Sequence, residues 1–477
     1  MSIPRLSGTP GRDRAAQYIV DTLTRNGLAV SRMPFVFSTA PIVFLKLAGA
    51  IALALVIAAI ACWAEHSPLP FVFSVGAFAV VGLASVLVRF VILGNSFDTA
   101  QSDGAANAPD AVPHTVPAIA QSRRPSLFLR RLGRSLASRL GKRIRGENIY
   151  ACLKRECRRA PTARPQTGAV TDGTNARLLL VAHYDSKGQN MSISTRIAMA
   201  ILGGVGLLFA ITLSALNLVP SIAPAADVSG RYHMAFALAS CLAFASLLIL
   251  TTDNSSPGAI DNASGVAVLL DVAARLSAGG ALSGTGLEVA FLLTDAEEYA
   301  LAGAAAFVGG MRAAYDDAAA VASTSERTAA ETGGARYRRT FVLNLDGPGA
   351  GENYVLFFKR PCGTASADRE EGQAWADASD FLRVLNEAAV KESIRMKLRR
   401  RLIGAMADHL PFVWEGIPAA TLCGMSGTIG LVHTRGDEPA RVSEAGMRGA
   451  AGFALRVVEE MAARTLPSAV TTRRTSS

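Results

Sequence analysis

Four long apolar segments constrain the fold of this 477-residue chain more than any other feature. They begin at Leu47, Leu69, Ile197 and Met234, and each approaches the roughly 20 apolar residues that span a lipid bilayer. None has a charged residue in its interior, and the mean hydropathy of +0.29 is too high for an ordinary soluble enzyme. Because the segments come as two close pairs, we predict two transmembrane helical hairpins, with buried core helices as the alternative. We expect no cleavable signal peptide before them, and therefore a multi-pass integral membrane protein with four helices.

The positive charge of the chain is concentrated in one segment. The formal net charge is +10, and many of the basic residues lie between Arg123 and Arg145. Apolar residues recur in this segment at helical spacing: Leu129, Leu132, Leu136, Leu140 and Ile144. We predict a basic amphipathic helix on an anionic membrane lipid surface, and a basic disordered linker is the alternative. Nucleic-acid binding is not expected, because neither interleaved aromatic residues nor a recognised nucleic-acid motif accompanies the arginines.

Outside the apolar segments, strand and helix patterns alternate along the chain. Strand patterns such as "ARLLLVAHYD" and "LEVAFLLT" are interleaved with helix patterns such as "SGVAVLLDVAARLSAGG". This alternation predicts an α/β fold with a helix-covered, largely parallel mixed sheet. The six cysteines are scattered and predict neither a disulfide framework nor a thiolate metal site. We divide the chain into a globular domain in three pieces (1–40, 147–190 and 253–465), two hairpins (41–95 and 191–252), a flexible linker with the basic segment (96–146) and a disordered tail (466–477).

Histidines and carboxylates recur where the predicted strands end. In "LLLVAHYDSKGQ" an apolar run is followed directly by His183 and Asp185. Similar residues follow later strand and turn patterns: Asp261, Glu297, Glu298, Asp346 and His433. Each of them alone could cap a helix, end a strand or lie in solvent. Together they would meet at the sheet edge where ligand groups collect, and they suit two zinc ions or similar cations, a bridging carboxylate and an unbound base.

The order of these motifs resembles a known family. The chain contains, in sequence, "GTPGRDRAAQYIVDTLTRNGLAVSRMPF", "LLVAHYDS", "PGAIDNASGVAVLLDVAARL", "VAFLLTDAEEYALAGAAAFV", "LNLDGPG", "DHLPFVWEGIPA" and "HTRGDEPARV". These motifs are similar to those of the zinc-dependent peptidases that include the bacterial double-zinc aminopeptidases, glutamate carboxypeptidase II and the glutaminyl cyclases. The resemblance covers most of the chain outside the hairpins, linker and tail, and it implies the α/β/α sandwich of that family.

The resemblance also implies two zinc ions per chain and a set of protein ligands. Asp261 would bridge the two ions. His183 and Asp346 would complete the coordination of one ion. Glu298 and His433 would complete that of the other.

Further residues receive roles from the same resemblance. Glu297 would be the general base that takes a proton from the attacking water and later donates it to the leaving amine. Asp185 would hold the second ring nitrogen of His183. The peptide bond after Asp261 would be cis, and Asp408 and Asp437 would support the site or the fold.

Three functions follow from the resemblance. A membrane-anchored metallo-aminopeptidase, which hydrolyses N-terminal peptide bonds of peptide substrates with two-metal-activated water, agrees with the full ligand set. A glutaminyl cyclase with a single zinc is the alternative suggested by "HYDSK" and "DHLPF", although Val432 stands where a tryptophan is expected. A catalytically inactive membrane module is the third possibility. The sequence identifies neither the oxyanion donor nor the oligomeric state.

The distribution of basic residues predicts the orientation in the membrane. Both hairpins begin and end on the side of the globular domain, where basic residues flank the spans: Arg25, Arg32, Lys46, Arg89, Lys187 and Arg196. The loop "AEHSP" on the opposite side has no lysine or arginine, and the other loop has only Arg231. Because lysine and arginine accumulate on the cytoplasmic face, we predict a cytoplasmic catalytic domain.

Overall fold

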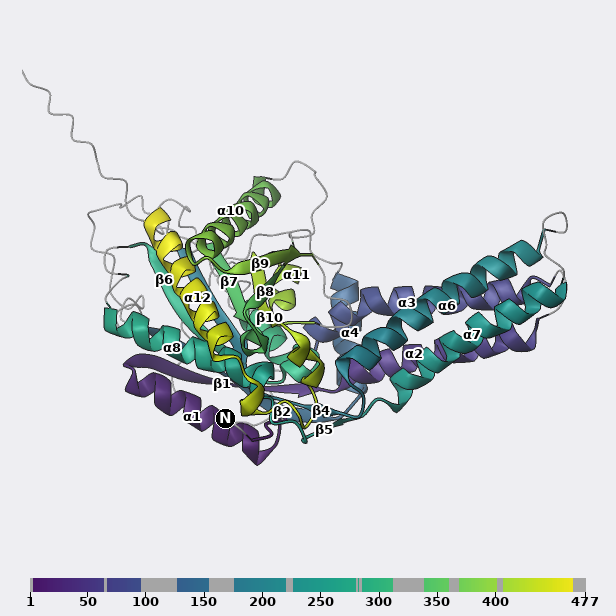
Figure 1. Ribbon diagram of the computed structural model, residues 1–477, viewed down its shortest axis with the longest axis horizontal. Coiled ribbons are helices and arrows are strands. Elements are labelled where there is room, and N and C mark those ends of the chain that lie inside the picture. Colours follow the sequence, from purple (N-terminus) through teal and green to yellow (C-terminus); the bar gives the residue numbers. More distant parts are fainter. Residues whose placement is uncertain are drawn as a thin grey trace, which may run out of the picture.

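The computed structural model describes residues 3–63, 67–95, 127–153, 176–219, 226–279, 282, 285–311, 339–359, 369–400 and 406–465. The linker of residues 96–126 and the tail of residues 466–477, for which the sequence predicted flexibility, lie outside these ranges. Figure 1 shows a globular α/β domain from which a bundle of long helices projects to one side.

An eight-stranded mixed sheet forms the centre of the globular domain. Its order is β1 (Leu28–Ser38), β2 (Arg143–Leu153), β6 (Leu287–Thr294), β3 (Ala176–His183), β7 (Arg339–Leu345), β10 (Ala419–Met425), β8 (Asn353–Phe358) and β9 (Arg395–Arg399). The four central strands β6, β3, β7 and β10 are parallel, whereas β1, β2 and β8 pair with their inner neighbours in the antiparallel sense. All eight residues of β3 are buried, as expected for a strand covered on both faces. The predicted fold class is therefore confirmed.

Helices cover both faces of this sheet. The larger apolar core packs one face against α1 (Pro10–Arg25), α8 (Ser264–Gly279), α10 (Arg369–Lys391) and α12 (Glu444–Arg464). A smaller core packs the other face against α11 (His409–Trp414) and the helix Ala302–Met311. In α1, Ala16, Ile19 and Leu23 are fully buried on one side, which is the spacing of an amphipathic helix. The carboxyl ends of the parallel strands remain free to carry polar side chains.

The projecting bundle consists of four helices: α2 (Ala40–Ala61), α3 (Leu69–Leu93), α6 (Ile193–Asn217) and α7 (Ala226–Ile249) (Figure 1). Among the described residues, these are the helices long and apolar enough to cross a membrane. Small and apolar side chains, including Ala52, Val56 and Ala210, pack inside the bundle. Large apolar side chains such as Phe78 and Leu208 are exposed on its outer surface, as expected for contact with lipid.

The second hairpin returns the chain to the point where it left the globular domain. The short strands β4 (Gly188–Gln189) and β5 (Thr252–Asp253) pair at its base. The side chain of Asn190 binds the backbone of Ile249 and Thr251 across the same junction, at 2.9 Å each. A long insertion closed in this way leaves the surrounding sheet undisturbed. This closure explains how a long helical hairpin can separate His183 from Asp261.

The basic helix is shorter than its apolar stripe predicted. Helix α4 (Leu127–Arg139) ends before Ile144, which lies in β2 and packs near Phe35 and Phe37 of β1. Pairing with the whole of β1 gives these residues a strand ladder in place of further helix. The apolar side of α4 packs on Ala40 and Val91 at the base of the bundle. The basic residues Arg131, Arg134 and Arg139 of α4 are exposed.

One cysteine also differs from expectation. Cys62, Cys241 and Cys423 are free, whereas Cys152 is disulfide-bonded. The spacing of cysteines along the sequence did not indicate this bond, because spacing does not show which cysteines folding brings together.

Candidate metal centre

Strand register brings the predicted site residues together. His183 is the last residue of β3 and lies opposite Thr294, the last residue of β6. Glu297 and Glu298 follow β6 after a turn through Ala296, and Asp346 follows directly after β7. Because β6, β3 and β7 are parallel neighbours, all three strand ends lie at the same edge of the sheet.

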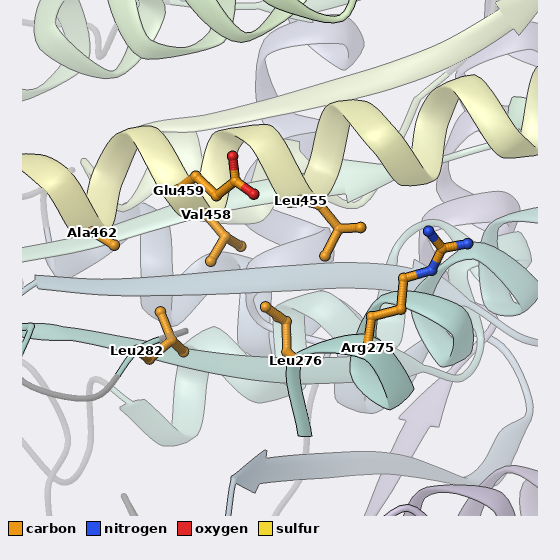
Figure 2. Close-up of a pocket in the computed structure, with 7 residues that line it drawn as sticks. All are labelled: Arg275, Leu276, Leu282, Leu455, Val458, Glu459 and Ala462. Carbon is orange, nitrogen blue, oxygen red and sulfur yellow. The ribbon is translucent and has the colours of Figure 1, made fainter. Parts of the chain in front are cut away.

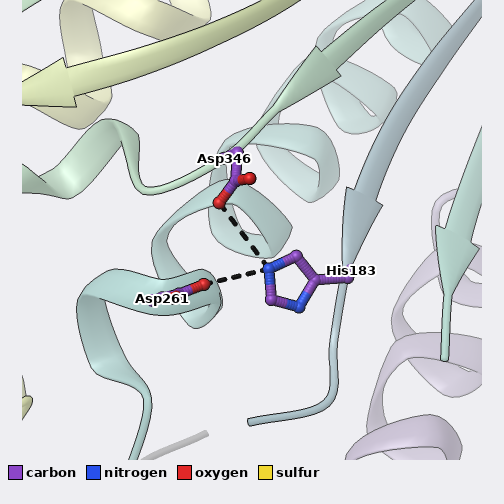
Figure 3. Close-up of side chains that lie close together, drawn as sticks. All are labelled: His183, Asp261 and Asp346. Carbon is purple, nitrogen blue, oxygen red and sulfur yellow. Dashed lines mark ion pairs between the residues drawn. The ribbon is translucent and has the colours of Figure 1, made fainter. Parts of the chain in front are cut away.

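The first group of possible metal ligands consists of His183, Asp261 and Asp346. The Nε2 atom of His183 lies 2.9 Å from Oδ1 of Asp261 and 3.6 Å from Oδ1 of Asp346. Figure 3 shows this ring nitrogen facing both carboxylates. His183 is buried, and each carboxylate is partly accessible. We call this group the first half-site.

The second group consists of Asp261, Glu298 and His433, and we call it the second half-site. The Nε2 atom of His433 lies 3.1 Å from Oδ2 of Asp261 and 3.1 Å from Oε1 of Glu298. Asp261 therefore turns one carboxylate oxygen toward each histidine. These are the two groups of this kind found among the described residues.

Three atoms of these half-sites are buried without a hydrogen-bond partner in the described part of the chain: His183 Nε2, His433 Nε2 and Glu298 Oε1. Their contacts have the distances of ion pairs but not the geometry of hydrogen bonds. Leaving a buried polar atom unsatisfied costs about 1–3 kcal/mol, so three such atoms in one cluster require an explanation. Imidazole nitrogens and carboxylate oxygens within a few ångströms of one another suit zinc, and the residues fit that ion.

Asp185 joins the first half-site to the turn that carries both glutamates. Its carboxylate accepts hydrogen bonds from the backbone N–H groups of Glu297 and Glu298, at 3.2 Å and 3.3 Å. The Nδ1 atom of His183 lies 3.4 Å from the Asp185 carboxylate and 3.2 Å from its carbonyl oxygen. Both groups can accept a hydrogen bond from a protonated Nδ1, which leaves Nε2 free to bind a cation.

Glu297 and Glu298 are sequence neighbours with opposite pKa shifts. Burial raises the pKa of Glu297 well above its usual value, and nearby carboxylates add to the effect despite His183. Burial acts in the same direction on Glu298, but His433 and Lys187 outweigh it and lower the pKa of Glu298. Two carboxyl groups whose environments separate their pKa values can divide the tasks of proton carrier and ionised ligand.

Backbone hydrogen bonds hold the turn that carries Asp261. The peptide bond between Asp261 and Asn262 is cis, as the resemblance implied. Asp437 accepts hydrogen bonds from the backbone N–H groups of Ile260 and Asp261, at 2.6 Å and 3.2 Å. The side chain of Asn262 binds the backbone of Leu345 and Gly347 on either side of Asp346. Asp437 therefore positions Asp261, and Asn262 positions the backbone on either side of Asp346.

Asp408 lies near the same sheet edge, beside the end of β6, and belongs to neither half-site. It is buried and accepts a hydrogen bond from the hydroxyl of Thr294, the residue paired with His183. Burial raises the pKa of Asp408 to about 7. Its position agrees with the supporting role that we expected.

Three cations beside the site were not recognised in the sequence. The guanidinium of Arg5 is buried and donates hydrogen bonds to the carbonyls of Tyr184, Pro257 and Gly258. Lys187 places its Nζ atom 2.6 Å from Oε2 of Glu298. Arg196 places Nη2 at 2.8 Å from Nδ1 of His433. Lys187 and Arg196 had been counted only as charges flanking the membrane, since their contacts are long-range and leave no local pattern.

Elsewhere, a pocket lies between α8 and α12 (Figure 2). Its lining is largely apolar with one charged residue from each helix: Arg275, Leu276, Leu282, Leu455, Val458, Glu459 and Ala462. It contains none of the residues of the half-sites.

A sequence family matches the part of the chain from the second half of α7 to α12. Residues 242–458 match Peptidase family M28. The resemblance to the zinc-dependent peptidases is thereby confirmed. The matched range contains Asp261 and every later site residue, while His183 and Asp185 precede it. The match supports a peptide hydrolase that uses zinc. No curated protein matches the sequence.

The solved structures to which the chain is similar have low sequence identity to it. The LapA aminopeptidase of Legionella pneumophila is 15% identical with a TM-score of 0.35, over 66% of this chain and 56% of LapA. The chain thus spans little more than half the length of LapA. BSAP, a zinc aminopeptidase from Bacillus subtilis, is 14% identical with a TM-score of 0.41, over 96% of this chain and 91% of BSAP. The glutaminyl cyclase of Fimbriiglobus ruber is 14% identical with a TM-score of 0.43, over 96% of this chain and 90% of the cyclase. No functional assignment rests on these likenesses.

Proposed function

We propose that this protein is a membrane-anchored zinc metallo-aminopeptidase that removes N-terminal residues from peptides. One observation carries the proposal. Two groups of possible ligands share Asp261, and three of their atoms are buried without hydrogen-bond partners in the described part of the chain: His183 Nε2, His433 Nε2 and Glu298 Oε1. Two zinc ions per chain would account for all three unpartnered atoms.

The residues around the half-sites would divide the chemistry. Zinc, when bound, would polarise the scissile carbonyl and increase the acidity of water. Glu297 is not part of either half-site, and its raised pKa suits a group that takes a proton and then donates it to the leaving amine. Asp185 would hold the proton of His183 at Nδ1 and fix the backbone of both glutamates.

Metal analysis combined with a substrate screen tests this function. The purified full-length protein should contain up to two zinc ions per chain and hydrolyse aminoacyl-p-nitroanilides. One zinc per chain together with cyclisation of N-terminal glutamine would replace the proposal by a glutaminyl cyclase. Full zinc occupancy without either activity would indicate an inactive membrane module of the same fold.

We further propose that four transmembrane helices anchor a catalytic domain that faces the cytoplasm. The helices α2, α3, α6 and α7 and the exposed basic residues beside α4 support this arrangement. The disulfide of Cys152 is the observation against it, because disulfides persist mainly in oxidising compartments. A reporter enzyme fused after Ser477 decides between a cytoplasmic catalytic domain and one on the opposite side of the membrane. Activity of a reporter that works only outside the cytoplasm would reverse the orientation.

A further inference from the structure

The two histidines of the metal centre have opposite neighbours at Nδ1. His183 faces the carboxylate and carbonyl oxygens of Asp185, which can only accept hydrogen bonds. His433 faces Nη2 of Arg196 at 2.8 Å. A guanidinium has five N–H donors and no acceptor, so Nδ1 of His433 must accept in this contact. The ring proton of His433 is then on Nε2, the atom that faces Asp261 and Glu298.

This arrangement opposes metal binding by His433. A histidine that binds a metal through one nitrogen nearly always donates the proton on its other nitrogen to a carboxylate, carbonyl or water. His183 has that arrangement, and His433 has the reverse. A cation at Nε2 of His433 would require a proton on Nδ1, directly opposite a donor of Arg196.

A second cation acts on the same half-site. The Nζ atom of Lys187 lies 2.6 Å from Glu298, and its side chain is largely buried. Because like charges repel and burial reduces their screening by water, both cations disfavour a metal ion beside them. The first half-site has Asp185, an anion, in the corresponding position.

The contact of Arg196 is built into the junction between the membrane bundle and the globular domain. Arg196 lies in the first turn of α6, whose amino end is capped by Ser192. Ile193 of the same turn packs against the apolar cluster of Ile260 and Val432, the residues next to Asp261 and His433. The backbone of Gln189 also donates a hydrogen bond to the carbonyl of His433, at 2.9 Å. Helix α6 therefore places the guanidinium of Arg196 against Nδ1 of His433.

We propose that Arg196, supplied by the membrane helix α6, is a positioning residue that makes zinc binding at the second half-site weaker than at the first. The inference rests on the proposed metal centre. Zinc thus binds the first half-site before the second, and loading of the second requires Arg196 to withdraw from His433. The membrane bundle and the occupancy of the peptidase centre are coupled through this one side chain.

Stepwise zinc titration tests the proposal. The full-length protein in detergent is stripped with a chelator and titrated with Zn²⁺ against a chromogenic competitor. The wild type should bind a second zinc at least about 10-fold more weakly than the first. Arg196→Gln, whose amide oxygen can accept from Nδ1, should tighten the second step by about 10-fold to 100-fold and leave the first within about threefold. An Asp346→Ala background, which removes a ligand of the first half-site only, assigns the step that responds.

Two further variants serve as controls. Arg196→Lys retains the cationic donor and should leave the second step weak. Arg231→Gln removes an exposed arginine of α7, in the same bundle, and should change neither step. General damage to the fold would weaken both steps, whereas the proposal requires that one becomes stronger.

Each remaining outcome contradicts the inference in a recognisable way. Two equal zinc affinities in the wild type, or a second step that weakens in Arg196→Gln, would overturn it while the aminopeptidase function could stand. Absence of any zinc binding would overturn the proposed metal centre and the inference with it.

Discussion

The two half-sites share one carboxylate and use the same ligand chemistry, yet the chain supports them differently. The first is built at the end of the buried strand β3, with Asp185 behind its histidine. The second depends on His433, which follows β10 in a loop and contacts Arg196 of the long apolar helix α6. The two half-sites therefore differ in the groups that contact the second nitrogen of each histidine, and such groups influence which nitrogen is free to bind a metal.

The largest expected effect comes from a residue outside both half-sites. Glu297→Gln should lower kcat by about 100-fold to 10,000-fold, because the amide cannot take a proton from water. Zinc content should remain that of the wild type, since neither half-site loses a ligand. Steady-state kinetics and metal analysis of the same preparation measure the two quantities. Retained activity at full zinc occupancy would remove Glu297 from the mechanism.

Asp261→Ala should abolish the difference between the half-sites by damaging both. The carboxylate has one oxygen near each histidine, so zinc affinity should fall at both steps by at least roughly 100-fold. Asp271→Ala, at a partly exposed position on α8, is the matched control and should bind zinc normally. Loss of only one step in the titration would show that Asp261 does not bridge.

Asp185→Asn should make the first half-site resemble the second. The substitution removes the negative charge near Nδ1 of His183, and zinc affinity at the first step should fall by about 10-fold to 100-fold. A falling kcat is also expected, because Asp185 holds the backbone of Glu297. The same zinc titration supplies the measurement. An unchanged first step would mean that the carbonyl oxygen of Asp185 suffices to orient His183.

Lys187→Met should give the smallest change, in the direction of greater similarity between the half-sites. Removing the ammonium near Glu298 should tighten the second step by roughly threefold to tenfold, less than Arg196→Gln, because lysine is flexible and can move away from a bound ion. Titration of both single variants and the double variant measures their separate contributions. A weaker second step would indicate that Lys187 orients Glu298 for binding.

Local patterns in the sequence were sufficient for several parts of the molecule. Apolar length predicted the hairpins, and the alternation of strands and helices predicted the parallel centre of the sheet. The positions of three site residues follow from strand pairing. Because β3 and β6 are parallel neighbours, His183 and the two glutamates lie at the same edge of the sheet. The prediction that the basic helix extends to Ile144 was wrong. The helical spacing of apolar residues did not reveal that residues 143–153 would pair with β1.

Local patterns therefore marked the acids and histidines that follow strands and turns, and the structure brings five of them together. Their roles as metal ligands come from the family resemblance and stay predictions. The surroundings of those ligands were decided by the tertiary structure alone. Arg5, Lys187 and Arg196 reach the site through contacts between segments that are far apart in the chain. Hydrogen bonds and charges of this kind depend on distances of a few ångströms in space, and residue spacing along a chain carries no information about such distances until the fold has closed.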